Sequence, residues 1–272
     1  MREITIGQYY FADSPIHRLD PRVKIAFTGI YMVSLFFGKS PLAFLLATMV
    51  FLTVVKISQV PLSFMVRGLK PIAIIILFSV VVNMLFVPGD VLVRIGVIQV
   101  TKQGLVQAVF LTIRLALLIM GASLLTLTTT PNQLTDGLEK MFGFLNKIHV
   151  PVHEIAMMMS IALRFIPILT EETDKIMKAQ IARGADLESG NLIQKIKSLV
   201  PILVPLFVAA IRRANDLAMA MEAKCYNGSE GRTKMKPLCY QKEDRMGYVL
   251  LFAYLLLMIG VNVISKTIGL SF

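Results

Sequence analysis

The sequence predicts an all-α polytopic membrane protein with about five transmembrane helices. Of its 272 residues, 56% are hydrophobic, and the mean hydropathy is +0.70. Soluble domains hold roughly 45–50% apolar residues even when glycine is counted. Several runs also reach the roughly 17–25 apolar residues that a helix needs to cross a bilayer. Charged segments separate these runs, which indicates membrane-spanning helices joined by loops in water.

Five apolar spans follow one another, at about 23–38, 41–55, 71–87, 105–127 and 247–264. Gly38-Lys39-Ser40-Pro41 predicts a tight turn between the first two, because Gly commonly ends a helix and Pro begins one. Pro88-Gly89-Asp90 breaks the chain after the third span. The alternation of apolar and polar residues from there to Gln103 predicts a short external hairpin.

The net charge of +11 gathers at the amino terminus, in 56–70 and in 129–245. This distribution is typical of cytoplasmic segments. Because the longest of them carries 16 Lys/Arg against 13 Asp/Glu, it is mixed in charge and does not indicate a nucleic-acid partner. We expect a transmembrane part at 1–130 with a cytoplasmic amino terminus, cytoplasmic helices at 131–245, and a last transmembrane part at 246–272.

The sequence shows no catalytic constellation and no cofactor site. It lacks the glycine-rich loop with Lys-Ser/Thr that holds nucleotide phosphates, so we expect no ATP hydrolysis by this chain alone. Cys225 and Cys239 have no neighbouring ligand cluster, which predicts free thiols and no metal. His149 and His153 are four residues apart, a spacing that could bind a metal on a helix. Because Pro151 interrupts the helix between them, we expect no metal site there. The first 22 residues contain no signal peptide pattern.

The cytoplasmic segment is expected to form three helices. The first begins at Pro131, the second runs from after Pro151 to Arg183, and the third runs from near Leu192 to Lys224. The third carries an apolar stripe at Leu206, Ala210, Leu217 and Met221. At 1.5 Å per residue, each of the last two helices extends up to about 45 Å. Methionines at 157–159, 219 and 221 supply adaptable apolar surface.

These two long helices end on similar tripeptides, Ala182-Arg183-Gly184 and Ala223-Lys224-Cys225. A cation in the last turn followed by Gly is a common helix end, so a single occurrence indicates only capping. The second copy has Cys in place of Gly, and Cys is not a usual capping residue. Capping alone therefore leaves the pair unexplained. We expect both cations to dock on partner proteins, where a guanidinium can bind a carboxylate through two hydrogen bonds.

The amino-terminal sequence Ile6-Gly7-Gln8-Tyr9-Tyr10, followed by the run from Asp13 to Arg22, resembles the T component of energy-coupling factor (ECF) transporters. The two tripeptides resemble that family's paired Ala-Arg-Gly signatures. Residues 220–223 and 228–235 are similar to the shared T component that serves several substrate-binding subunits. The resemblance covers essentially the whole chain. It departs from the family at Lys224, which keeps the charge of the usual Arg but lacks its two-pronged geometry.

The resemblance implies a non-catalytic scaffold that couples two ATP-binding subunits to one exchangeable membrane-embedded substrate-capture (S) subunit for uptake of a vitamin or micronutrient. It also implies that the three cytoplasmic helices form a coupling domain and that both tips dock on the ATPases. Two alternatives remain open. One is an ABC permease subunit that itself lines the substrate path, and the other is a membrane-embedded enzyme acting on lipids.

Arg114 lies midway along the fourth span, where a charge is costly. It is either a polar contact within the bundle, with Asn83 as a candidate partner, or a side chain that reaches the membrane surface.

Overall fold

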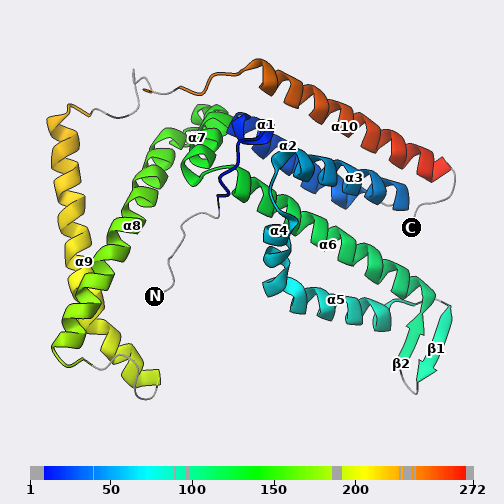
Figure 1. Ribbon diagram of the computed structural model, residues 1–272, viewed down its shortest axis with the longest axis horizontal. Helices are drawn as coiled ribbons and strands as arrows, with labels where there is room; N and C mark the ends of the chain where they lie inside the picture. Colours follow the sequence, from blue (N-terminus) through cyan, green and yellow to red (C-terminus); the bar gives the residue numbers. More distant parts are fainter. Residues whose placement is uncertain are drawn as a thin grey trace. The chain divides into compact units, whose positions relative to one another are not determined.

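The computed structural model describes residues 9–38, 40–88, 90–95, 98–185, 192–226, 228, 235 and 237–267 (Figure 1). The chain forms two compact units. The first comprises Met1–Gly137 with Leu238–Phe272, and the second comprises Leu138–Pro237. The limits predicted from the sequence divide the chain by the side of the membrane, whereas these two units divide it by internal contacts. The units therefore do not test the predicted limits, which stay a prediction.

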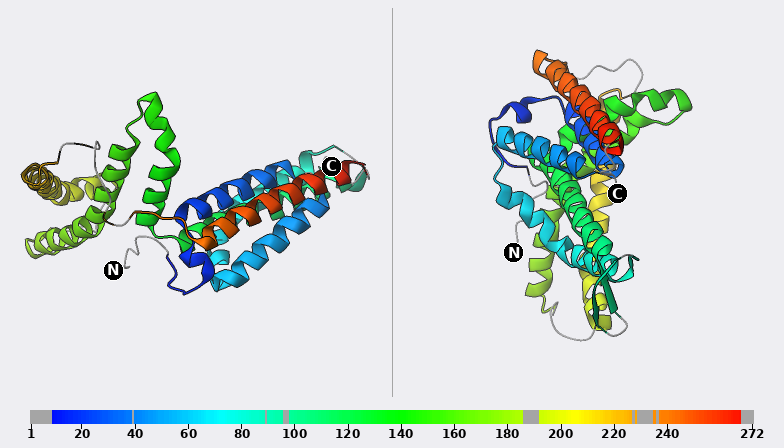
Figure 2. Two further views of the ribbon diagram at one scale, coloured as in Figure 1. Left: turned by 90° about the horizontal axis from the view of Figure 1, so that it is seen from above. Right: turned by 90° about the vertical axis from the view of Figure 1, so that its right-hand side faces the viewer.

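The first unit is a helical bundle with a small hairpin. Four long helices lie alongside one another (Figure 2): α2 (Pro21–Phe37), α3 (Pro41–Ser58), α6 (Lys102–Thr128) and α10 (Lys242–Thr267). The shorter elements are α1 (Pro15–Arg18), α4 (Leu62–Leu69), the 3₁₀ turn η1 (Lys70–Ile72), α5 (Ala73–Phe86), β1 (Val91–Ile95) and β2 (Ile98–Thr101).

Several helices begin with the same kind of N-terminal cap. A hydroxyl or carboxylate oxygen at the capping position accepts a backbone N–H of the first turn, which would otherwise lack a partner. Three of these helices also have Pro in their first turn, where its fixed backbone angle favours the helix. The capping residues are Ser14 for α1, Asp20 for α2, Ser40 for α3 and Thr101 for α6.

The predicted turn and the hairpin itself are confirmed, the external position of the hairpin stays a prediction, and the loop expected at 56–70 is wrong. α2 ends at Phe37 and α3 starts at Pro41, while β1 and β2 pair in antiparallel fashion. The segment 56–70, however, forms α4 and leads through η1 directly into α5. α3 ends at Ser58 and a new helix begins after Pro61, because charged residues mark a position near water but do not by themselves exclude a helix.

The centre of the bundle is packed with aromatic and aliphatic side chains. The Tyr31 ring contacts the rings of Phe51 and Tyr254, and the Ser34 hydroxyl and the Tyr254 hydroxyl are 2.6 Å apart. Because lipid is as apolar as these side chains, their burial gains little from the hydrophobic effect within a bilayer. Close packing and internal hydrogen bonds therefore hold this core together.

One end of the bundle is fastened by a polar cluster. The Asp244 carboxylate accepts the Asp20 N–H at 2.7 Å, and Arg22 donates two hydrogen bonds to the Asp20 carboxylate. Partial burial alone would raise the pKa of the Asp20 carboxyl, but the Arg22 bonds outweigh it and hold that pKa below its usual value. The Lys24 amine donates to the carbonyls of His17 and Thr128. The cluster thus ties α10 and the end of α6 to the start of α2.

The second unit is built on two long helices, α8 (Val152–Ala182) and α9 (Leu192–Ala223), with the 3₁₀ segment η2 (Gly143–Ile148) before them. α7 (Pro131–Phe142) contains the boundary between the units. α8 and α9 pack against each other in antiparallel directions: Arg213 forms an ion pair with Glu172 at 3.2 Å, and the Gln180 amide donates to the Pro201 carbonyl at 3.1 Å. The predicted limits of both helices are confirmed.

Among the described residues, six helical segments are long and apolar enough to cross a membrane. They are Pro41–Ser58, Leu62–Met84, Lys102–Thr128, Val152–Ala182, Lys197–Ala223 and Lys242–Thr267. The chain is therefore a polytopic, all-α membrane protein apart from its hairpin. These six segments differ from the five predicted spans in two ways. They include α8 and α9, which the distribution of charge predicts to be cytoplasmic. They omit α2, which has 17 residues. Five crossings stay a prediction.

Candidate functional site

The end of α8 forms a two-bond helix cap around Arg183. The Gly184 N–H donates to the Ile181 carbonyl at 2.9 Å, and the Ala185 N–H donates to the Gln180 carbonyl at 3.0 Å. Gly184 has a φ of +85°, in the left-handed region that Gly adopts without strain. These are the two hydrogen bonds of a Schellman motif, which satisfies carbonyls at the end of a helix.

The end of α9 has the same cap, 41 positions later in the sequence. The Cys225 N–H donates to the Glu222 carbonyl at 2.8 Å, and the Tyr226 N–H donates to the Met221 carbonyl at 3.0 Å. Cys225 takes the left-handed position with a φ of 54°. Lys224 therefore occupies the same place in its motif as Arg183. The similarity of the two tripeptides is a similarity of backbone geometry.

This cap corrects one step of the sequence reasoning. Cys225 does occupy the capping position, so the absence of Gly at the second tip does not show that capping is absent there. A non-glycine residue in this conformation costs about 1–2 kcal/mol, because its Cβ approaches the carbonyl oxygen. The second tip keeps the cap geometry despite this cost.

Cys225→Gly should raise the stability of the second unit by about 1 kcal/mol, since Gly removes this strain. Gly184→Ala, at the matching position of the first tip, should lower it by a similar amount. Thermal unfolding of the detergent-solubilised chain measures both. Equal stability of Cys225→Gly and wild type would show that the second tip carries no strain.

The two cations are available for binding. Arg183 and Lys224 are both exposed, and neither side chain has a hydrogen bond or ion pair to any described residue. The flanking Ala182 and Ala223 are exposed as well, so small side chains surround each cation. Each tip thus presents one exposed positive charge at the end of a helix, which suits insertion into an acidic groove.

The tips lie at opposite ends of the helix pair. The contact of Gln180 with Pro201 places the end of α8 beside the early part of α9. From Pro201 to Lys224 is about 23 residues, or roughly 35 Å along a helix. A single groove cannot hold two cations so far apart, so the geometry provides two separate binding points.

The structure also reveals an apolar surface that the sequence reasoning missed. The predicted stripe on α9 is half-buried, as its contact with α8 requires. A second stripe on α9 is exposed, with Leu203 at 63% and Phe207 at 65%. We call it the α9 apolar face, and it consists of Leu199, Val200, Leu203, Val204, Phe207, Val208 and Ile211. The four-residue spacing of Leu199, Leu203 and Phe207 was the signal that could have predicted it. Met158 and Met159 of α8 and Met219 of α9 are exposed too.

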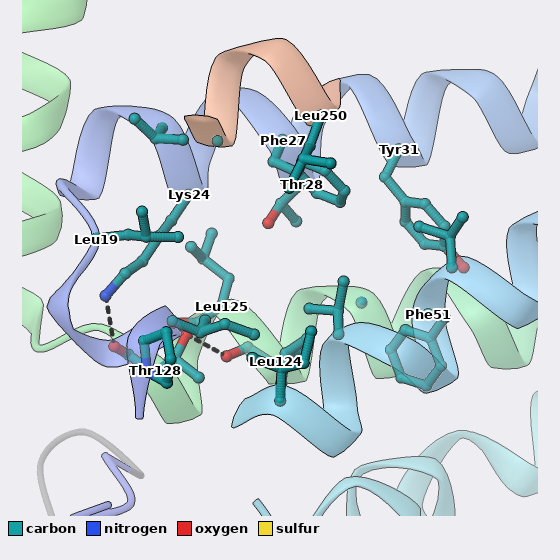
Figure 3. Close-up of a pocket in the computed structure, with 18 of the residues that line it drawn as sticks. Leu19, Lys24, Phe27, Thr28, Tyr31, Phe51, Leu124, Leu125, Thr128 and Leu250 are labelled. Atoms are coloured by element: carbon teal, nitrogen blue, oxygen red, sulfur yellow. Dashed lines mark hydrogen bonds between the residues drawn. The ribbon is translucent and has the colours of Figure 1, made fainter. Parts of the chain in front are cut away.

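The first unit contains an apolar cavity of about 460 Å³ between α2, α3, α6 and α10 (Figure 3). Tyr31, Phe51 and Leu124 line it, and the Lys24 amine donates to the Thr128 carbonyl at one end. The lining has no pair of acids and no nucleophile beside a base. The cavity therefore offers space for an apolar group and no machinery for acid–base catalysis.

Arg114 and Asn83 do not bond to each other. Arg114 donates to the Gly38 carbonyl at 3.2 Å, whereas the Asn83 amide donates to the Ser79 carbonyl at 2.8 Å. Both nevertheless line one small pocket. His153 contacts Glu139 at 2.9 Å, and the described residues include no group of three or more His, Cys, Asp or Glu able to hold a metal.

Comparison with known proteins agrees with the resemblance. Residues 12–235 match the family described as "Cobalt transport protein". The chain is 52% identical over 249 residues to the "Energy-coupling factor transporter transmembrane protein EcfT" of Thermosediminibacter oceani, covering 92% of this chain and 94% of that protein. It is 54% identical over 246 residues to the protein of the same name from Clostridium kluyveri, covering 90% and 91%. The relative of that name from Bacillus subtilis is 46% identical over 245 residues, covering 90% and 92%.

The family match extends into both units and includes the helix pair and the two capped tips. The chain belongs to the transmembrane T components of energy-coupling factor transporters, the EcfT family.

Proposed function

We propose that this chain is the scaffold that couples two ATP-binding subunits to one exchangeable S subunit during uptake of a vitamin or micronutrient. The observation that carries the proposal is the pair of capped tips. Arg183 at the end of α8 and Lys224 at the end of α9 hold equivalent places in the same type of cap. Both are exposed, neither side chain is paired with a described residue, and the two helix ends lie roughly 35 Å apart along α9. Two equivalent binding points suit two similar partners.

Each tip docks in an acidic groove of one ATPase subunit. A cation that meets a buried carboxylate forms a charge-assisted hydrogen bond, roughly twice as strong as a neutral one. The rigid helix behind each tip carries the motion of the ATPase to the rest of the second unit. Because Lys224 lacks a guanidinium fork, the second groove is expected to hold its cation through a single point contact.

The α9 apolar face binds the S subunit. An exposed row of large aliphatic and aromatic side chains is a typical protein or membrane contact. Exposed methionines elsewhere on α8 and α9 suit a partner that is exchanged, because Met side chains adapt to different surfaces. Neither surface transfers a chemical group, so ATP hydrolysis belongs to the partner subunits.

A permease subunit that lines the substrate path is the second candidate. Such a subunit presents one coupling helix to one ATPase, whereas the described residues here present two capped tips. The arrangement therefore favours the scaffold.

The scaffold lies in the cell membrane, with its amino terminus and residues 129–245 in the cytoplasm. The support is the excess of Lys and Arg in these segments. α8 and α9 could span a membrane by composition, but their ends carry the two tips that must meet soluble ATPases. Reaction of a cysteine introduced at residue 234 with an impermeant reagent from outside intact cells would contradict this orientation.

Co-expression tests the scaffold directly. A tagged chain should retain two ATP-binding chains and one S subunit after extraction from the membrane, while the purified chain alone should turn over no ATP. The stoichiometry can be measured by native mass spectrometry, and either two different ATPases or two copies of one satisfy the prediction. Retention of a single ATP-binding chain, or ATP turnover by the pure chain, would contradict it.

A further inference from the structure

We propose that the pocket around Arg114 binds the phosphate group of a membrane phospholipid. The pocket measures about 270 Å³ and lies in the first unit between the α2–α3 turn, α5 and α6. Its lining combines one cation and two amides with two aromatic rings: Arg114, Asn83, Gln107, Phe44 and Phe110, together with Gly38 and Leu111.

The guanidinium of Arg114 is only partly satisfied. It donates one hydrogen bond to the Gly38 carbonyl at 3.2 Å and lies 5.3 Å from the centre of the Phe44 ring. Its Nε–H is buried and has no partner. Carbonyl and ring contacts stabilise a cation only weakly compared with a full negative charge. The side chain is therefore fixed in place with its charge uncompensated.

Among the described residues, no acidic side chain forms an ion pair or hydrogen bond with Arg114. Between Asp20 and Asp136 the sequence contains a single acid, Asp90, whose carboxylate accepts a hydrogen bond from Gln103 at the start of α6. The acids of α10 lie in its first turn. Gly38 lies instead beside Met258 of α10. Met258 is about 14 residues, or roughly 21 Å, further along the helix than Asp244.

The level of the pocket points to lipid phosphate as the missing anion. Arg114 bonds to Gly38 at the end of α2, where the chain turns into α3. With 17 and 18 residues, these two helices are about 25–27 Å long, close to the roughly 30 Å of a hydrocarbon core. The α2–α3 turn therefore lies near the boundary with the headgroups, where phosphates are concentrated.

The order of assembly favours a lipid over the carboxylate of a partner subunit. The chain must insert in the membrane before it meets any membrane partner, and an unpaired charge near the hydrocarbon is costly throughout that time. Phospholipid is present at once. The guanidinium can bind two phosphate oxygens, and the amides of Asn83 and Gln107 provide further donors.

Thermal unfolding of the full-length chain in an uncharged maltoside detergent tests this site. After removal of bound lipid, phosphatidylglycerol should raise the Tm of the wild type by at least about 3 °C. An uncharged diglucosyl diacylglycerol and inorganic phosphate should each leave it unchanged. Arg114→Gln should lose the response, whereas Lys102→Gln, which removes an exposed cation from the start of the same helix, should keep it.

A purely structural Arg114 would behave differently. If phosphate compensates the charge, Arg114→Gln should be at least as stable as wild type in lipid-free detergent and less stable than wild type with phosphatidylglycerol. Arg114→Lys keeps the charge but loses the two-pronged geometry of the guanidinium, so its Tm should respond to phosphatidylglycerol more weakly than that of the wild type. This variant replaces Arg114→Gln in the test if the Gln variant does not fold.

Three results would overturn the proposal. An equal Tm rise with the glycolipid would mean that acyl chains alone stabilise the bundle. A rise with inorganic phosphate alone would mean a general anion site. A lipid response unchanged in both Arg114 variants, with stabilisation only by a co-expressed membrane subunit, would assign the anion to that partner.

Discussion

Removing both tip cations, Arg183→Ala with Lys224→Ala, should abolish retention of the ATP-binding subunits on a tagged, membrane-extracted chain. Each substitution leaves a groove carboxylate buried without its partner, which costs about 2–5 kcal/mol of binding free energy. With one tip intact, the remaining tip still holds its ATPase subunit. Any weaker contacts of the complex then form at high effective concentration, so that part of the assembly is retained. With neither, that advantage disappears.

The single variants should follow the chemistry of each tip. Arg183→Ala should lower transport sharply while the chain inserts normally, and Arg183→Glu should be worse because it places two negative charges together. Lys224→Arg should be tolerated, since it restores the charge and adds the fork. Stability alone should change by only about 0.3–1 kcal/mol, the size of a helix-dipole contribution.

A matched control separates docking from general charge. Lys178→Ala removes an exposed cation from α8 within two turns of the first tip and should leave ATPase retention unchanged. Full retention by the double variant would mean that the tips only end their helices, and the docking assignment would be wrong.

The sequence predicted the long helices and their ends because these depend on local signals. Hydrophobic runs set the bundle helices, and the tripeptides around Arg183 and Lys224 end α8 and α9 at the predicted positions. Local signals failed where the surrounding structure imposes a conformation that the residue disfavours. Cys225 is an example, since the helix end imposes a left-handed backbone that the residue itself disfavours.

Contacts between distant segments could not be read from the pattern. Arg114 contacts Gly38, 76 positions away, and Asp244 bonds to Asp20 across 224 positions. The α9 apolar face was missed for a related reason. A helix that is apolar on two sides gives a weak periodic signal, and only the position of α8 shows which side stays exposed.

The second large effect is expected from substitutions on the α9 apolar face. Leu203→Glu with Phe207→Glu should release the S subunit, lowering its retention at least tenfold, while both ATP-binding chains stay bound. The two side chains are 63% and 65% exposed, so the change does not disturb packing within the second unit. In a closed interface the new carboxylates would lose water without gaining partners, which is strongly unfavourable.

Quantification of each subunit after affinity purification measures this selectivity, with Arg212→Glu as the control. Arg212 is an exposed residue of α9 outside the apolar face, and its substitution introduces the same carboxylate. It should leave all subunits bound. Retention of the S subunit by the double variant would exclude the α9 apolar face as its binding surface. A fall in the amount of inserted chain, with loss of every partner at once, would instead indicate that α9 crosses the membrane, because glutamates in hydrocarbon impair insertion.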